Sequence, residues 1–253
     1  MNLTGKGFRS DEFYGTPLSR RNARDLKGIL DRCGLLLEEH AFPALLPVPE
    51  PHLGSLFPVY SLKPAEPAGR AEAPVPEISG PCIVIGMMRM GYGHYRTGLA
   101  LASAATANGV TPLLFDPGWV SEEIYRNLGR LDAWYRKGSQ LAHRSSLFNS
   151  LVWERGTGKT FKKIDAMVRV YRAAGQLLPA FLPLDEQWPF VGTHSWLSQA
   201  ASLRGMTRVA NAVQDNWPKG FFLSGRGIQC VQGPSSYSGY RLTLGMGGRR
   251  KEA

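Results

Sequence analysis

The residues best suited to chemistry lie in a glycine-rich segment, Gly91-Tyr92-Gly93-His94, which follows an apolar run. Because Gly91 and Gly93 lack side chains, the backbone of such a turn can come close to a bound molecule. His94 stands where a helix is expected to begin, and the helix dipole keeps an imidazole neutral there. A neutral imidazole can accept a proton from a hydroxyl group, and Arg96 can hold a phosphate or carboxylate. We interpret the turn as a ligand site with His94 as the catalytic base. The alternative is a tight turn whose histidine bonds only to backbone.

Two further polar clusters follow expected strands, at residues 193–196 and 214–218. In an open parallel sheet the connecting loops at the carboxyl ends of the strands meet along one edge, which is where ligands bind. We therefore expect His194, Asp215 and Asn216 to converge on the glycine turn. The alternative is helix capping, since a serine and an aspartate in these clusters are good caps.

Several familiar patterns are incomplete. The segment 156–160, Gly-Thr-Gly-Lys-Thr, resembles part of a phosphate-binding loop, but Trp153 stands where the first glycine belongs and no buried strand precedes it. A dinucleotide fingerprint would need glycine in place of Arg96. An NAD(P)-dependent oxidoreductase, favoured by a strand–helix–strand unit that ends at Asp116, is opposed by that same arginine. The five histidines and three cysteines show no metal-ligand spacing, so we expect neither a metal nor a resident cofactor.

Hydrophobic runs and their breakers predict an open, mostly parallel, Rossmann-like α/β sheet with flanking helices. Strands are expected at 82–86, 110–115, 189–193, 208–213 and 228–232. Helices are expected at 21–39, 97–107, 196–204 and from 234 onward, with two or three more between 121 and 178.

The chain divides into three parts. Residues 1–79 are interpreted as an N-terminal extension and proline-rich linker, because nine prolines between 43 and 76 forbid regular helix. Residues 80–245 form the Rossmann-like domain, and residues 246–253 are expected to be a disordered tail.

The chain is basic, with a net charge of +10, and 11 Lys/Arg face 5 Asp/Glu between residues 121 and 172. A basic surface suits phosphate-bearing partners. A stripe of Phe161, Ile164, Val168 and Tyr171 among lysines and arginines can lie on an anionic membrane or pack on the sheet. The sequence shows neither a signal peptide nor about 18 successive apolar residues. We expect a cytoplasmic protein that can lie at the inner face of the membrane.

The strand Ile83-Val84-Ile85, the glycine turn ending in His94 and the small-residue helix after it resemble the opening of GT-B glycosyltransferases. The plant-type monogalactosyldiacylglycerol synthases are the closest in pattern, together with the bacterial transferase that adds N-acetylglucosamine to the lipid-linked peptidoglycan precursor. The resemblance covers about residues 80–245 and includes the strand ends at 193–194 and 213–216. Tyr92 departs from it, since a glycine is usual there.

The resemblance implies the N-terminal, acceptor-binding half of a glycosyltransferase, with His94 as the base. Such a half helps to move a sugar from a nucleotide donor to a hydroxyl, here of a lipid or glycolipid. The domain that holds the donor is not evident in the chain. The resemblance therefore implies either a fragment or a chain that pairs with a separate donor subunit, and nucleic acid is not an expected partner. A non-catalytic binding module, or the partner subunit of a split glycosyltransferase, is the alternative.

Overall fold

The computed structural model describes residues 12–13, 16–39, 43–53, 57–65, 78, 80–158, 168–216 and 222–247. The strands are β1 (Glu12–Phe13), β2 (Thr16–Pro17), β3 (Leu45–Pro49), β4 (Tyr60–Pro64), β5 (Cys82–Gly86), β6 (Thr111–Phe115), β7 (Phe190–Gly192), β8 (Val209–Ala212) and β9 (Ile228–Cys230). The helices are α1 (Arg20–Glu39), α2 (Gly93–Ala107), α3 (Pro117–Val120), α4 (Glu122–Arg144), α5 (Ser146–Phe148), the π-helix η1 (Asn149–Gly158), α6 (Val168–Phe181), α7 (Ser195–Arg204) and α8 (Pro234–Gly247).

A seven-stranded sheet in the order β3-β4-β6-β5-β7-β8-β9 forms the centre of the molecule. Every neighbouring pair is parallel except β3 and β4. The expected Rossmann-like α/β fold is therefore confirmed. The five strands that the apolar runs predicted are all present, in the order β6-β5-β7-β8-β9.

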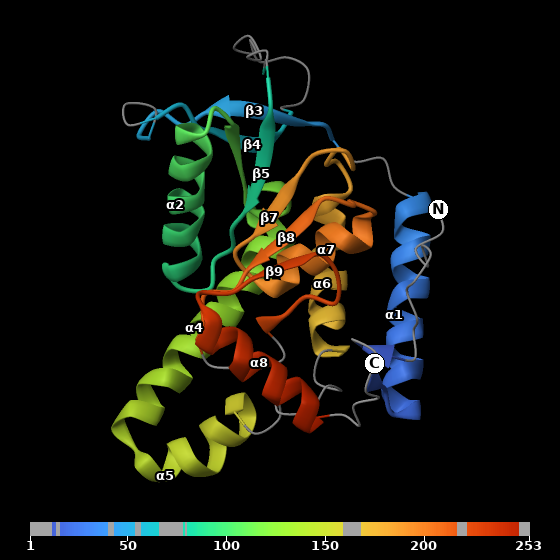
Figure 1. Cartoon of the computed structure of the whole chain (residues 1–253), viewed down its shortest axis with the longest axis vertical. Helices are drawn as coiled ribbons and strands as arrows, with labels where there is room; N and C mark the ends of the chain where they lie inside the picture. Colours follow the sequence, from blue (N-terminus) through green and yellow to red (C-terminus); the bar gives the residue numbers. More distant parts are fainter. Residues whose placement is uncertain are drawn as a thin grey trace.

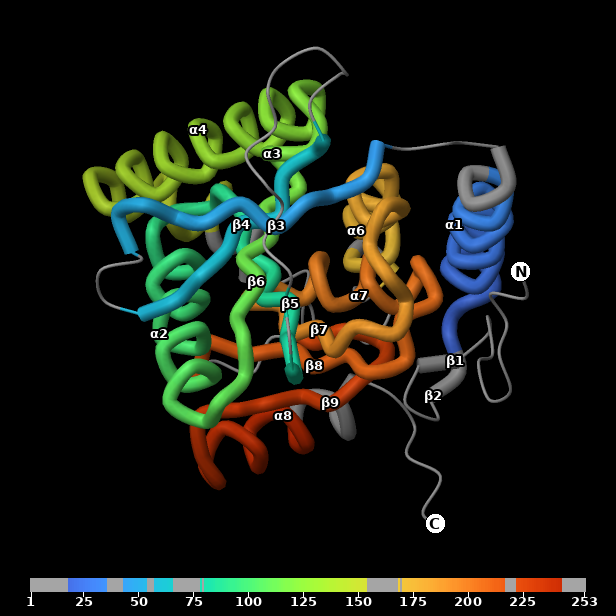
Figure 2. Tube along the Cα trace, turned by 90° about the horizontal axis from the view of Figure 1, so that it is seen from above, coloured from blue at the N-terminus to red at the C-terminus, as the bar shows by residue number. Residues whose placement is uncertain are grey.

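Helices cover both faces of the sheet (Figures 1 and 2). Side chains alternate along a strand, so Val84 and Ile85 of β5 point to opposite faces. Ile85 joins a cluster with Ala102 of α2, whereas Val84 joins the larger cluster that includes α1, α6 and α7. The helices that follow β5 and β7 thus lie on opposite faces.

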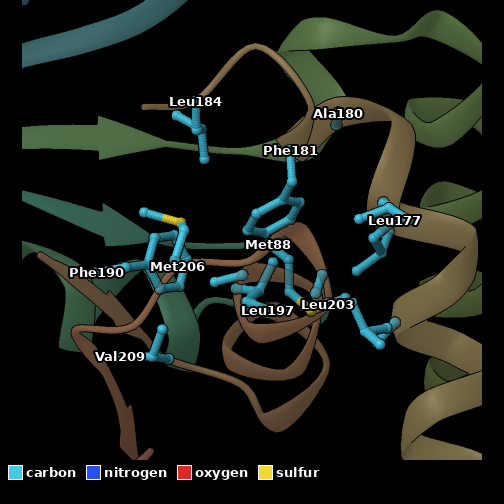
Figure 3. Packing of buried hydrophobic residues seen from close by; sticks show 14 of the residues in the cluster. Met88, Leu177, Ala180, Phe181, Leu184, Phe190, Leu197, Leu203, Met206 and Val209 are labelled. Carbon is cyan, nitrogen blue, oxygen red and sulfur yellow. The ribbon is translucent and has the colours of Figure 1, made fainter. Parts of the chain in front are cut away.

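Three phenylalanine rings pack together within the larger, mostly aliphatic cluster, and Figure 3 shows two of them, Phe181 and Phe190. The ring of Phe181 lies 4.9 Å from that of Phe115 and 5.5 Å from that of Phe190, centre to centre. All three are fully buried, and each such side chain contributes about 1.5–3 kcal/mol to stability. This packing holds α6 against the strands that carry the candidate site.

The sheet extends beyond the N-terminal limit predicted at residue 80. The proline-rich stretch supplies β3 and β4, and β4 pairs in parallel with β6. Pro47 and Pro49 are tolerated because β3 is an edge strand with only one neighbour to bond. The described part of this stretch contains no helix, as expected from its prolines, but part of the predicted linker belongs to the sheet.

Helix α1, in the predicted extension, also contributes to the core. Its side chains Leu26, Ile29, Leu30 and Cys33 are buried in the larger cluster, and Figure 2 shows α1 alongside α6. The first two residues of the predicted tail, Met246 and Gly247, are instead the end of helix α8 (Pro234–Gly247). Prolines 67, 74 and 76, and residues 248–253 of the predicted tail, lie outside the described residues.

The stripe of apolar side chains among lysines and arginines, for which a membrane surface and the sheet were the two alternatives, lies partly within the described residues. Val168 and Tyr171 are 3% and 1% exposed, so this part of the stripe packs into the core. Phe161 and Ile164 lie outside the described residues. Among the described helices, none has both the length and the apolar character needed to cross a bilayer.

Candidate functional site

The glycine turn joins β5 to α2, as expected. Gly91 has φ +76°, which glycine adopts without strain, and a side chain added there would meet nothing within 4 Å. Its N–H donates to Oδ1 of Asp132 on α4, at 3.0 Å. Gly93 opens α2, and a Cβ there would lie 3.3 Å from Oε1 of Gln214. The turn is thus anchored to α4 while Gly91 itself faces open space.

The turn lies at the point where the strand order reverses. From β5 the chain crosses by α2 to β6 on one side, whereas β7, the other neighbour of β5, leads by α7 to β8 on the opposite side. The connections after β5 and β7 therefore diverge to opposite faces of the sheet. Open α/β sheets bind ligands at such switch points.

His94, in the first turn of α2, is held by groups at the ends of β7 and β8. Its Nδ1 lies 2.8 Å from the carbonyl oxygen of Thr193 and 3.0 Å from Nε2 of Gln214. The Gln214 amide also donates to the Thr193 carbonyl, at 3.0 Å. Because a carbonyl oxygen can only accept, we assign the proton to Nδ1, which donates it to the Thr193 carbonyl. The Gln214 amide, also a donor, then bonds to the same carbonyl and not to Nδ1. That tautomer leaves the lone pair on Nε2, to which no described residue forms a hydrogen bond.

Burial lowers the pKa of His94, and the hydrogen bond to the Thr193 carbonyl and the charge of Asp215 oppose that effect. The imidazole is therefore neutral at pH 7. A neutral ring with an unprotonated Nε2 has the form that a general base requires.

His194 has a structural role. Its Nδ1 accepts a hydrogen bond from the backbone N–H of Trp196 at 3.2 Å and so caps α7. The ring is 8% exposed and meets that of His94 edge-on, with centres 5.1 Å apart. Burial, and secondarily the neighbouring His94, holds its pKa well below the usual value. Helix capping was the alternative interpretation of this cluster. The cap of α7 is His194, not the serine that follows it.

The other predicted site residues do not contact His94. Arg96 and Asp215 are exposed, and Asp215 acts on His94 only through its charge. The backbone oxygen of Asp215 accepts from the Tyr240 hydroxyl at 3.2 Å. Asn216 accepts from Ser236 Oγ at 2.6 Å, which ties the end of β8 to α8. The polar clusters converge as expected, but through Thr193 and Gln214 rather than through Asp215 and Asn216.

The carboxylate of Asp116, at the end of β6, is occupied by hydrogen bonds within the protein. Its carboxylate accepts from the Tyr95 hydroxyl at 2.5 Å and from the Gly118 N–H at 2.8 Å, and it is 3% exposed. Burial raises its pKa. In dinucleotide-binding enzymes the corresponding acid must face the ribose. These two partners instead occupy Asp116, which weighs against the oxidoreductase alternative.

Comparison with known proteins places the chain in a family. A family model described as a domain of unknown function, DUF6937, matches residues 44–242. The chain belongs to the DUF6937 family. The matched segment begins at β3 and includes all seven strands of the sheet and the glycine turn. No curated protein and no solved structure matches the chain.

Three groups that contact the glycine turn or His94 were not predicted from the sequence: the Thr193 carbonyl, the Gln214 amide and the Asp132 carboxylate. Thr193 and Gln214 stand within the predicted clusters, but nothing in their spacing singles them out. Asp132 lies inside a helix and carries no local signal. The hydroxyl of Thr193 is also buried without a partner among the described residues. Within those residues no three His, Cys, Asp or Glu side chains are grouped to hold a metal.

Proposed function

We propose that this chain is the acceptor-binding half of a glycosyltransferase, in which His94 takes the proton from the hydroxyl that receives the sugar. The observation that carries the proposal is the hydrogen bond from His94 Nδ1 to the Thr193 carbonyl, because it assigns the lone pair to Nε2. Loss of the hydroxyl proton to Nε2 makes the oxygen a stronger nucleophile toward the anomeric carbon of the sugar. As that carbon bonds to the acceptor oxygen, its bond to the phosphate oxygen breaks and the nucleoside diphosphate leaves.

The position of the site supports an acceptor role. Gly91 faces open space three residues before His94, and the N-cap residue of α2, Tyr92, makes no side-chain cap hydrogen bond. The resemblance to GT-B enzymes in the strand, turn and helix gives the reaction class. A lipid or glycolipid acceptor fits the basic region between residues 121 and 172, with its 11 Lys/Arg.

The test is sugar transfer by the full chain from nucleotide-sugar donors to diacylglycerol or glycolipid, with and without a separately supplied donor subunit. Loss of a general base costs about 10²–10⁴-fold in rate. His94→Ala should therefore lose transfer by that factor while circular dichroism shows an unchanged fold. His52→Ala, at an exposed histidine, serves as the control. Transfer at the wild-type rate by His94→Ala would contradict the proposal.

A non-catalytic binding module is the second candidate, and one observation favours it. The partner of His94 Nδ1 is a neutral carbonyl rather than a carboxylate, so no buried anion strengthens the base. In that case the wild-type chain binds glycolipid without transferring sugar. His94→Ala then weakens glycolipid binding, and there is no transfer rate to lower.

A further inference from the structure

The second half of α4 and the segments after it form a projecting hairpin, residues 133–153, named here the α4–η1 hairpin. Figure 1 shows α4 leading away from the sheet to α5 at the lower left. The ring of Trp153 returns against α4, 5.7 Å from the ring of Trp134 and 5.3 Å from that of Tyr135. Gly138 lies directly under this ring, where any side chain would collide with it. The aromatic contacts hold the hairpin closed.

The α4–η1 hairpin presents large apolar side chains to solvent. Leu147 is 67% exposed, Trp134 60% and Val152 54%. The full exposed set is Trp134, Tyr135, Leu141, Leu147, Leu151 and Val152. Isolated exposed apolar residues are common, but six within 19 residues of sequence indicate a surface that meets another apolar phase.

The charges of the hairpin are all of one sign. Residues 133–153 contain Arg136, Lys137 and Arg144 and no aspartate or glutamate, and two acids, Asp132 and Glu154, flank the segment. All three basic side chains are exposed. A second copy of this chain, docked symmetrically through this segment, would bring two sets of like charge into one interface, which is unfavourable. An anionic surface with an apolar interior complements both features at once.

We propose that the α4–η1 hairpin docks the protein on the surface of an anionic lipid bilayer. Trp134 and Tyr135 lie at the level of the headgroups, the leucines and Val152 reach the acyl chains, and the three basic residues bind lipid phosphates. The surface is separate from His94, and the proposal stands whether or not that residue moves a proton.

Docking there would bring the glycine turn close to the membrane. Asp132, which binds the N–H of Gly91, immediately precedes the hairpin on α4. On the same helix the Tyr125 hydroxyl accepts from Arg89 at 2.6 Å. Helix α4 therefore connects the turn directly to the docking surface.

The test is cosedimentation of the full chain with vesicles of phosphatidylcholine alone or with 30% phosphatidylglycerol, at low and high salt. We expect binding to the anionic vesicles that weakens in high salt. Arg136→Gln/Lys137→Gln should weaken it about 30-fold, since each basic residue near such a surface contributes about a factor of five. Arg20→Gln/Arg21→Gln removes the same charge from the exposed start of α1 and should leave binding nearly unchanged.

The apolar contribution is tested by Leu147→Ser against Ile228→Ser, an equally exposed apolar residue on β9 at 70%. Only Leu147→Ser should weaken vesicle binding, by about tenfold. The proposal would be overturned if the two charge variants, or the two apolar variants, weakened vesicle binding equally. So would a wild-type dimer in light scattering that Leu147→Ser converts to monomer without affecting vesicle binding. Vesicle binding by His94→Ala separates this surface from the proposed reaction.

Discussion

At the scale of single residues, the chemistry depends on which nitrogen of His94 carries the proton. The Thr193 carbonyl is a pure acceptor and fixes the proton on Nδ1. The Gln214 amide donates to the same carbonyl. The nearest acidic side chain in the cluster, Asp215, is exposed. His94 is therefore a neutral base, and burial is the main cause that lowers its pKa.

Gln214→Glu should change this balance. A carboxylate at the position of the amide, which lies 3.0 Å from His94 Nδ1, would favour the imidazolium and raise the pKa of His94. The measurement is NMR titration of the His94 ring protons. Asp215→Asn is the matched control: it removes a charge that raises the pKa, so it should move the pKa in the opposite direction. A titration unchanged by Gln214→Glu would show that the two side chains are not in contact.

Protonation of the two histidines should destabilise the fold in acid. The pKa values of His94 and His194 are lowered below the ordinary 6.5, so the folded state binds protons less readily than the unfolded chain. Their contribution to stability is complete above about pH 6.5 and is lost as the pH falls through the folded-state values. The midpoint of thermal unfolding should therefore fall between pH 7.5 and 5.

The variant His194→Asn isolates one histidine, because asparagine is also a good N-cap but does not titrate. The midpoint in this variant should fall less steeply with pH than in the wild type. His143→Asn, at an exposed position, controls for the removal of a histidine. An identical pH dependence in His194→Asn and wild type would contradict the assignment of a buried, neutral His194.

At the scale of elements, the sequence predicts the helices and strands whose position is determined by a local pattern of residues. Continuous apolar runs mark the buried parallel strands, as in Ile83-Val84-Ile85, and Gly205 ends α7 with φ +107°. β3 and β4 could not be predicted, because prolines obscure the pattern and the strands depend on distant pairing: β4 pairs with β6, and β3 pairs with β4. The contacts of His94 depend on strand order, which brings residue 94 to residues 193 and 214. That order is a long-range property that spacing does not encode.

Gly192 shows how closely β7 and α7 approach each other at the site. A Cβ at this position would lie 2.9 Å from the backbone nitrogen of Ser198 and 3.2 Å from the backbone oxygen of His194. Gly192→Ala must therefore shift the start of α7, and we expect a loss of about 1–3 kcal/mol in the free energy of unfolding. The measurement is urea denaturation.

Gly129→Ala is the matched control, because this glycine lies within α4 and has nothing within 4 Å of the added Cβ. It should stabilise the protein by about 0.4–1 kcal/mol. If the two alanine variants were equally stable, the close contact between β7 and α7 would be refuted.

At the scale of the whole molecule, the N-terminal region is part of the folded body. Leu26 of α1 and Leu62 of β4 are completely buried, in the same cluster as Val84. A chain beginning at residue 80 loses all such contacts, each contributing about 1.5–3 kcal/mol, against a typical total stability of 5–15 kcal/mol. It should not unfold cooperatively in circular dichroism.

A chain beginning at residue 18 removes only β1, β2 and the residues before them, and should keep a cooperative transition near that of the full chain. Cooperative folding of the chain that begins at residue 80 would show instead that the boundary predicted from the prolines is the real limit of the domain.

The central claim is that the imidazole of His94, at the junction between β5 and α2, is neutral and carries its lone pair on Nε2. The most direct measurement is the pair of ring ¹⁵N chemical shifts of His94 at pH 7, assigned by comparison with His94→Ala. The account predicts a protonated Nδ1 and an unprotonated Nε2. A proton on Nε2 alone, or on both nitrogens at that pH, would contradict it.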